Sequence, residues 1–164
     1  MPLFNMADLR AALPRHIRVL GLDPGAKIIG LALSDVTLML ASPYGSVKRG
    51  KLKANAAEIA AICAKEGAGG LLVGLPLSMD GTRGPAAQAA SDWALALSEA
   101  TGLPVAMWDE RLSSAAVNRA MIQEADMTRK RRAAAVDAAA AAYTLQAALD
   151  ATRPRLEDAP LSRY

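Results

Sequence analysis

The stretch Val19–Asp35, VLGLDPGAKIIGLALSD, decides the fold. Residues 17–23 and 28–34 are apolar runs, and the Pro24-Gly25 pair between them has the chemistry of a tight turn. Together they predict a β-hairpin that opens a sheet. The hairpin also carries a carboxylate, Asp23, where its first strand meets the turn. Asp23 could accept backbone hydrogen bonds as the first residue of an Asp-Pro-Gly turn, or it could serve a site at the end of the strand.

The rest of the chain alternates between strand-like and helical patterns. Apolar spacing and the turn residues that bound each run predict the following elements: a helix over 5–13, a third strand over 37–41 or 45–47 interrupted by Pro43, a helix over 52–65, a buried strand over 70–74, a helix over 85–100, a strand over 104–108, a helix from Ser113 or Ser114 to 124, and an alanine-rich helix over 132–150. This order predicts an α/β fold of three layers, with a mixed five-stranded sheet flanked by helices.

Length and composition favour one domain in a reducing compartment. The 164 residues suit a single domain, residues 1–164, with an N-terminal extension over 1–16 and a loose C-terminal tail over 151–164. The single cysteine, Cys63, lies in an apolar run and is expected to be a small buried side chain. Charged residues interrupt the N-terminal apolar pattern, and no run is long enough to cross a bilayer. We therefore expect a cytoplasmic protein with no membrane partner.

Two basic clusters stand out against a net charge of +3. One spans Lys48–Lys53 and the other Arg129–Arg132, and both flank predicted helix starts. Such a charge balance permits binding to nucleic acid, but many proteins without that partner share it. For either cluster alone, a solvated surface is the default interpretation.

Carboxylates occupy three places where a simple core would exclude them. Asp23 ends the first strand, Asp109 and Glu110 end the last strand, and Asp137 interrupts the alanine-rich helix. Small side chains on the same helix face as Asp137 would let that helix approach the sheet closely. Crowded carboxylates raise one another's pKa unless a cation lies between them. Oxygen ligands of this kind suit Mg²⁺ or Mn²⁺, and such a site can support phosphodiester hydrolysis.

Each carboxylate also has a purely structural interpretation. Asp23 could be a turn residue, as described above. Asp109 and Glu110 could be an acidic pair at a helix N-terminus with a surface ion pair, and Asp137 could face solvent. None of the three decides the function alone.

Taken together, four motifs resemble the YqgF/RuvX family of the RNase H-like superfamily, whose members include Holliday junction resolvase-like nucleases. The motifs are GLDPGAKIIGLALSD (21–35), VGLPLSMDGTRGP (73–85), WDERLSS (108–114) and RRAAAVD (131–137), and their order and spacing match over residues 17–150. The family pattern usually has Lys-Arg-Ile-Gly where this chain has Lys27-Ile-Ile-Gly30. This departure concerns a basic contact beside the site rather than the acidic ligands.

The resemblance implies an RNase H-like fold and a nuclease that depends on Mg²⁺ or Mn²⁺. It further implies that Asp23, one residue of the Asp109-Glu110 pair and Asp137 are the metal ligands and catalytic residues. Within the pair Glu110 is favoured, because adjacent strand residues face opposite sides of a sheet and only one can point to the site. Asp109 remains the alternative.

The same resemblance suggests which residues contact nucleic acid. Lys27 lies beside the first ligand, and Arg83 lies in the loop after the buried strand, whose other interpretation is an ordered helix cap. Arg111 could contact phosphate or hold Asp109 in place, and the cluster of Arg129, Lys130, Arg131 and Arg132 directly precedes the helix of Asp137. His16 is expected to be structural or exposed, and Trp93 and Trp108 are expected in the core.

The function associated with bacterial members of the family is maturation of the 5′ end of 16S ribosomal RNA. The expected partner is therefore structured RNA, namely precursor 16S rRNA or a ribosomal subunit. One alternative is a Holliday junction resolvase acting on branched DNA, which would need two active sites and hence a dimer. Another is a catalytically weak module that binds nucleic acid without cutting it. The sequence leaves open whether the protein is a monomer or a homodimer.

Overall fold

A computed structural model describes residues 3–75, 84–109 and 129–154, with only the backbone described over 129–136. Its elements, in chain order, are α1 (Met6–Ala12), β1 (Arg18–Pro24), β2 (Ile28–Ser34), β3 (Ala41–Lys48), α2 (Leu52–Glu66), β4 (Ala68–Leu75), α3 (Pro85–Thr101), β5 (Val105–Asp109) and α5 (Arg129–Ala151). The helix predicted from Ser113 or Ser114 lies outside the described residues.

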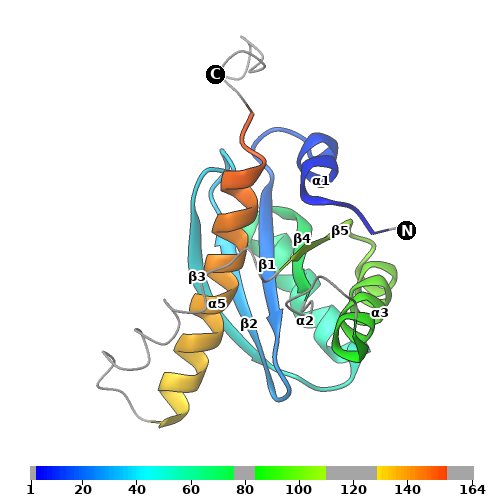
Figure 1. The fold of residues 1–164 in the computed structure, drawn as a ribbon, viewed down its shortest axis with the longest axis vertical. Coiled ribbons are helices and arrows are strands. Elements are labelled where there is room, and N and C mark those ends of the chain that lie inside the picture. Colours follow the sequence, from blue (N-terminus) through cyan, green and yellow to red (C-terminus); the bar gives the residue numbers. More distant parts are fainter. Residues whose placement is uncertain (1–2, 76–83, 110–128, 155–164) are drawn as a thin grey trace.

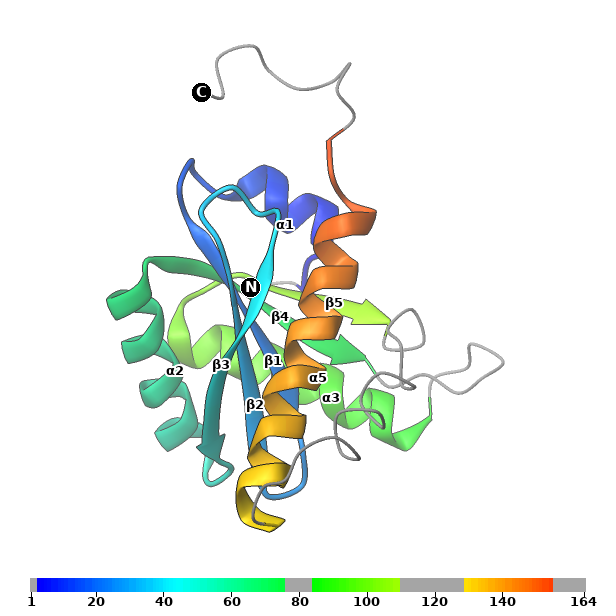
Figure 2. The same ribbon diagram turned by 90° about the vertical axis from the view of Figure 1, so that its left-hand side faces the viewer.

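The five strands form one mixed sheet in the order β3-β2-β1-β4-β5. The β1–β2 hairpin and the β2–β3 pair are antiparallel, and β4 and β5 continue the sheet in parallel with β1. Helix α5 covers one face, and α2 and α3 cover the other (Figures 1 and 2). The predicted RNase H-like three-layer fold, with its five-stranded mixed sheet, is therefore confirmed.

Strand alternation divides the core between the two faces. On β1, Leu20 and Leu22 point toward α2 and α3, where they pack with Ile59 and Leu97. Val19, which precedes Leu20 and has the opposite phase, packs in the cluster that contains Leu145 of α5. The expectation that Trp93 and Trp108 are core aromatics holds, since Trp93 packs against the first cluster and Trp108 against the second.

The N-terminal helix α1 belongs to the α5 side of the molecule. Its Met6 and Leu9 are fully buried in the second cluster, and Phe4 forms a parallel bridge to Ala106 of β5. Arg10 is itself buried, and its guanidinium donates a hydrogen bond to the carbonyl of Leu149 near the end of α5. The helix thus closes one end of the core. His16, expected to be structural or exposed, is exposed in the connection from α1 to β1.

The third strand differs from the sequence-based expectation. Instead of being interrupted by Pro43, β3 runs through it from Ala41 to Lys48. The reason is position, because β3 is an edge strand and Pro43, which has no N–H to donate, is tolerated there. Within the described segments, no helix has the length and apolar character required to cross a bilayer.

Candidate active site at the carboxyl end of the central strand

Helix α5 approaches the sheet closely at Gly30. A Cβ atom built on Gly30 would lie 2.1 Å from the carbonyl oxygen of Asp137 and 2.9 Å from its Cβ. Only a glycine leaves room for this approach, as expected where an isolated glycine interrupts a strand. Gly21 repeats the arrangement more loosely, with the Cβ of Leu145 at 3.1 Å from its own built Cβ. Two glycines therefore seat α5 on the hairpin.

The hairpin register brings Asp23 to the same place. Asp23 of β1 pairs directly with Gly30 of β2, and directly paired residues of antiparallel strands point to the same face. The residues that precede them in the chain, Leu22 and Ile29, both point toward α2 and α3. Asp23 and Gly30 therefore face α5. The structure thus places both Asp23 and Asp137 next to Gly30 on the α5 face, although the two acids are more than 100 positions apart in the chain.

The environment of Asp137 is unusual for a helix carboxylate. Asp137 is partly buried in the interface between α5 and the sheet, and burial raises the pKa of its carboxyl group. Desolvation disfavours the charged form of an acid, so a nearby cation would be favourable here. The interpretation of Asp137 as a solvent-facing helix residue is therefore wrong.

The acidic pair at the end of β5 is only partly described. Val105 and Met107 pack toward α2 and α3, whereas Ala106 and Trp108 pack toward α5. By this alternation Asp109, the last residue of β5, follows Val105 and Met107 and lies on the face away from Asp23 and Asp137. Glu110, the preferred member of the pair, lies outside the described residues.

The structure describes some of the predicted nucleic-acid contacts and not others. Lys27 is exposed in the hairpin turn, a few residues beyond Asp23. Arg129, Lys130, Arg131 and Arg132 are the first four residues of α5, and only their backbone is described. Arg83 and Arg111 lie outside the described residues.

No group of three acidic, histidine or cysteine side chains able to hold a metal ion occurs within residues 3–75, 84–109 and 137–154. Glu110, which completes the predicted ligand set with Asp23 and Asp137, lies outside those residues. What the structure provides is the pair of Asp23 and Asp137 on one face beside Gly30.

Two structural contributions were not identified from the sequence, one at the candidate site and one at the opposite end of β2. Gly30 was noted only as part of a motif, although a glycine inside an apolar strand is a signal of close backbone approach. Asp35 organises the turn after β2: its carboxylate accepts hydrogen bonds from the hydroxyl of Thr37 and from the backbone N–H groups of Met39 and Leu40. An Asp followed by polar and turn-forming residues is the signal for such a turn.

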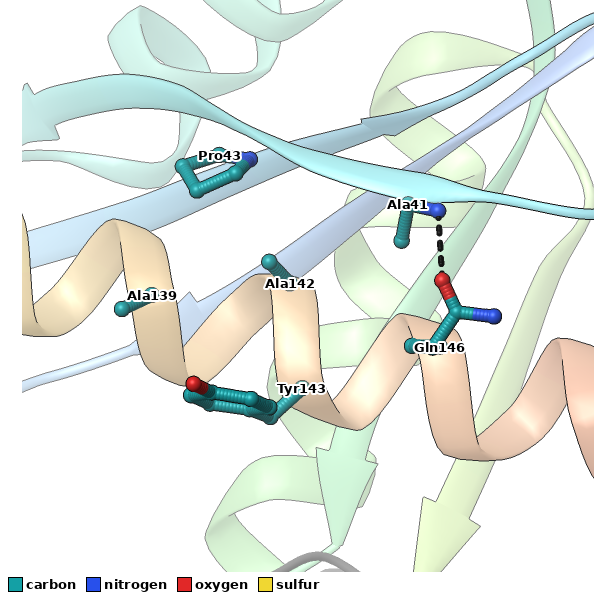
Figure 3. Close-up of a pocket in the computed structure, with 6 residues that line it drawn as sticks. All are labelled: Ala41, Pro43, Ala139, Ala142, Tyr143 and Gln146. Atoms are coloured by element: carbon teal, nitrogen blue, oxygen red, sulfur yellow. Dashed lines mark hydrogen bonds between the residues drawn. The ribbon is translucent and has the colours of Figure 1, made fainter. Parts of the chain in front are cut away.

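A shallow depression of about 250 Å³ lies elsewhere, between α5 and the edge strand β3 (Figure 3). Its lining is Ala41, Pro43, Ala139, Ala142, Tyr143 and Gln146. Gln146 is engaged, because its side-chain oxygen accepts a hydrogen bond from the N–H of Ala41 at 2.8 Å. The lining carries no charged residue and belongs to a different flank of α5 from Asp137, so the depression does not form part of the candidate active site.

Comparison with known proteins gives a consistent assignment. The family model described as "RuvX: Holliday junction resolvase" matches residues 17–151. A protein of Gluconacetobacter diazotrophicus, named "Putative pre-16S rRNA nuclease", is 70% identical over 152 residues, which cover 93% of this chain and 99% of that protein. Proteins of the same name from Acidiphilium cryptum and Gluconobacter oxydans are 65% and 63% identical, covering 96% and 94% of this chain and 100% and 96% of their own lengths.

Among solved structures, T. thermophilus RuvC in complex with Holliday junction substrate aligns with a TM-score of 0.49 at 18% identity. The alignment covers 79% of this chain and 92% of that chain.

Proposed function

The chain belongs to the RuvX family, and from that membership we propose that it is a nuclease that processes the 5′ end of precursor 16S rRNA during ribosome biogenesis. The observation that carries the proposal is the seating of Asp137 against Gly30, directly beside the strand position of Asp23. A role in ribosome maturation places the protein in the cytoplasm, with precursor rRNA or an assembling ribosomal subunit as its partner.

The acidic residues fit a divalent metal ion. Asp23 and Asp137 supply carboxylate oxygens, which Mg²⁺ and Mn²⁺ prefer, and burial raises the pKa of the Asp137 carboxyl group, which a bound cation would offset. We propose Asp23, Glu110 and Asp137 as the ligands. When bound, the metal would supply Lewis-acid activation of water and neutralise charge on the phosphodiester.

The choice of Glu110 over Asp109 follows from the alternation along β5. Asp109 has the phase of Met107, which packs toward α2 and α3, whereas Asp23 and Asp137 lie on the α5 side. Successive residues of a strand face opposite sides of the sheet. We therefore propose Glu110 as the functional acid and a structural role for Asp109.

The protein's own contribution is rigidity and position. The hairpin pairing fixes Asp23 relative to Gly30, and the contact with Gly30 fixes the height of Asp137 above the sheet. Both carboxylates belong to regular secondary structure, which holds side chains more tightly than loops do. Lys27 and the first residues of α5 extend from this point and would contact the phosphates of the substrate.

A cleavage assay tests the proposal. Purified protein is incubated with precursor 16S rRNA and, separately, with a four-way DNA junction, with and without Mg²⁺ or Mn²⁺. Asp23→Asn, Asp137→Asn and Glu110→Gln should each abolish metal-dependent cleavage of the rRNA. Asp92→Asn is the matched control, because Asp92 is an exposed acid on α3, hydrogen-bonded to Gln88.

The outcomes separate the candidate functions. Cleavage that survives both Asp23→Asn and Asp137→Asn would show that the site is elsewhere. Cleavage of the junction but not of the rRNA would favour the resolvase. Binding of either substrate without cleavage would favour a module that only binds. Loss of activity in Asp109→Asn with full activity in Glu110→Gln would reverse the assignment within the acidic pair.

A further inference from the structure

Three exposed lysines surround the junction between β3 and α2. Lys48 is the last residue of β3, Lys51 precedes the first residue of α2, and Lys53 lies in its first turn. We call these three residues the β3–α2 patch. All three side chains are exposed, and within the described parts of the chain none forms an ion pair with a carboxylate. The patch therefore presents uncompensated positive charge.

The backbone that carries the patch is held in place by a buried side chain. Asn55 is 1% exposed; its amide donates a hydrogen bond to the carbonyl of Lys48 at 3.0 Å and accepts one from the N–H of Gly50 at 2.9 Å. A buried amide that forms hydrogen bonds with two backbone groups holds a loop in one conformation. The lysines therefore project from a well-ordered connection between β3 and α2.

Arg49, inside the same segment, ties this connection to the hairpin turn. Its backbone N–H donates to the carbonyl of Lys27, and its guanidinium donates to the carbonyl of Gly25, both at 2.9 Å. The guanidinium also lies over the ring of Trp93, 5.6 Å from the centroid. Arg49 is thus a positioning residue, which fixes the patch relative to the turn that follows Asp23.

The sheet register places Lys48 on the face of the candidate active site. Asp23 pairs with Gly30, Gly30 pairs with Ser46, and Lys48 lies two residues further along β3. Lys48 pairs with Ile28, which has the same phase as Gly30, so both point to the α5 face. Two strand spacings of about 4.8 Å and two residue rises of about 3.4 Å put the Cα atoms of Asp23 and Lys48 roughly 12 Å apart.

The start of α5 lies at the same end of the molecule. Along β1 from Gly21 to Asp23, the contacts on α5 run backwards from Leu145 to Asp137, so the helix is antiparallel to β1. Residues 129–132 therefore continue past Asp137 toward the hairpin turn, by about 8 to 12 Å at 1.5 Å per residue. The hairpin turn, the end of β3 and the start of α5 share the lower end of Figures 1 and 2.

We propose that the β3–α2 patch binds the phosphate backbone of the substrate strand on one side of the cleaved bond, at the end of the molecule where α5 begins. This inference rests on the proposed nuclease function and adds a second contact surface to it. At about 3.4 Å per stacked nucleotide, a separation of roughly 12 Å puts Lys48 about three to four nucleotides from the bond beside Asp23. The contact is made to phosphates and carries no base specificity.

The test compares two double variants that each lose two positive charges. Lys48→Gln/Lys51→Gln removes charge from the patch. Arg15→Gln/Lys65→Gln is the matched control, because both residues are exposed and lie toward the other end, near the start of β1 and the end of α2. Equilibrium binding of precursor 16S rRNA is measured in EDTA from 0.05 to 0.3 M salt, and thermal unfolding verifies that both variants fold.

Two lost phosphate contacts should reduce the slope of log K against log salt by about 1.4 to 1.8. If the contacts contribute only counterion release, affinity at 0.1 M salt falls about 25- to 60-fold. The control should change neither quantity by a comparable amount. A shortened substrate that ends within two nucleotides of the cleavage site on the patch side should bind the patch variant and the wild type equally.

Two results would overturn the patch: equal slopes in the two double variants, or no binding by the wild type. Either can occur while Asp23 and Asp137 prove essential for cleavage, in which case the proposed function stands without the patch. The opposite case, in which the patch is correct and the proposed function is not, can also be recognised. If the wild type cuts nothing but the patch variant alone loses affinity and slope, the patch is supported and the nuclease proposal fails.

Discussion

Replacing Gly30 with alanine probes the contact on which the candidate active site depends. The added methyl group would lie 2.1 Å from the carbonyl oxygen and 2.3 Å from the carbonyl carbon of Asp137. Both atoms belong to the backbone of α5, so no side chain can rotate away to make room. Relief requires the helix to lift from the sheet, or the strand to bend, by more than about 1 Å.

The cost should be large for a single methyl group. Overpacking usually costs about 1 to 3 kcal/mol, and a clash with backbone lies at or above the top of that range. With about 3 kcal/mol lost, the melting temperature of a domain of this size should fall by about 6 to 12 °C. A shift of about 1 Å in a catalytic group can cost about a hundredfold in rate, so cleavage by the folded variant should fall by about that factor.

Alanine substitutions at two other glycines serve as controls for Gly30→Ala. Nothing lies within 4 Å of a Cβ built on Gly50, so Gly50→Ala should change the free energy of unfolding by less than about 0.5 kcal/mol. Gly21→Ala meets the Cβ of Leu145 at 3.1 Å and should fall between the two, at about 1 kcal/mol. Urea unfolding and the cleavage assay supply the readouts. If Gly30→Ala were as stable and active as Gly50→Ala, α5 could not be seated on Gly30, and the pairing of Asp23 with Asp137 would lose its basis.

Three further predictions concern Arg49, Asp35 and Cys63. Arg49→Met should cost about 1 to 2 kcal/mol in urea unfolding, because it loses the hydrogen bond to Gly25 and the contact with Trp93; an unchanged midpoint would show that Arg49 fixes nothing. Burial alone would raise the pKa of Asp35, but hydrogen bonds from Thr37, Leu40 and Met39 outweigh this effect and hold the pKa below its usual value. The stability that the Asp35 carboxylate contributes is therefore fully present above its pKa in the unfolded protein. That stability is lost as the pH falls through the pKa of Asp35 in the folded protein. Asp35→Asn should therefore be less stable than the wild type by about 1 kcal/mol at pH 7, with the gap closing toward pH 3, and a gap that widened in acid would contradict this. Burial raises the pKa of the Cys63 thiol to about 11, so a thiol reagent at pH 8 should label Cys63 only after unfolding, and rapid labelling of the native protein would exclude a buried thiol.

Local patterns predicted most of the elements because each rests on neighbouring residues. The hairpin follows from two apolar runs around Pro24-Gly25, and α2 and α3 end at Gly67 and Gly102, both in the left-handed conformation that glycine favours. The third strand was missed in part, since the acceptability of Pro43 depends on β3 lying at the edge of the sheet. That is a property of the whole sheet, which no local window of sequence contains.

The site shows the same division between local and global information. Sequence periodicity suggested that only one residue of Asp109 and Glu110 can face the site, but the choice of face needs the packing of Val105 and Met107 against α2 and α3. Likewise, the closeness of α5 was expected from its small residues, whereas the point of contact depends on Gly30, which lies more than 100 residues away from Asp137. A glycine in the strand and alanines in the helix are each weak signals, and only their meeting is specific.

The two basic clusters illustrate why charge alone could not be assigned. In the sequence, Lys48–Lys53 and Arg129–Arg132 are about 80 residues apart, and each is an ordinary surface segment. The direction of β3, parallel to β1, brings Lys48 to the carboxyl end of the central strand, and the opposite direction of α5 brings Arg129 to that same end. Positive charge at the end of the sheet that carries two carboxylates offsets their repulsion of a polyanion. Strand direction and helix direction, rather than composition, therefore bring two ordinary clusters to one end of the molecule, the end at which we propose that a phosphate backbone passes over Asp23 and Asp137.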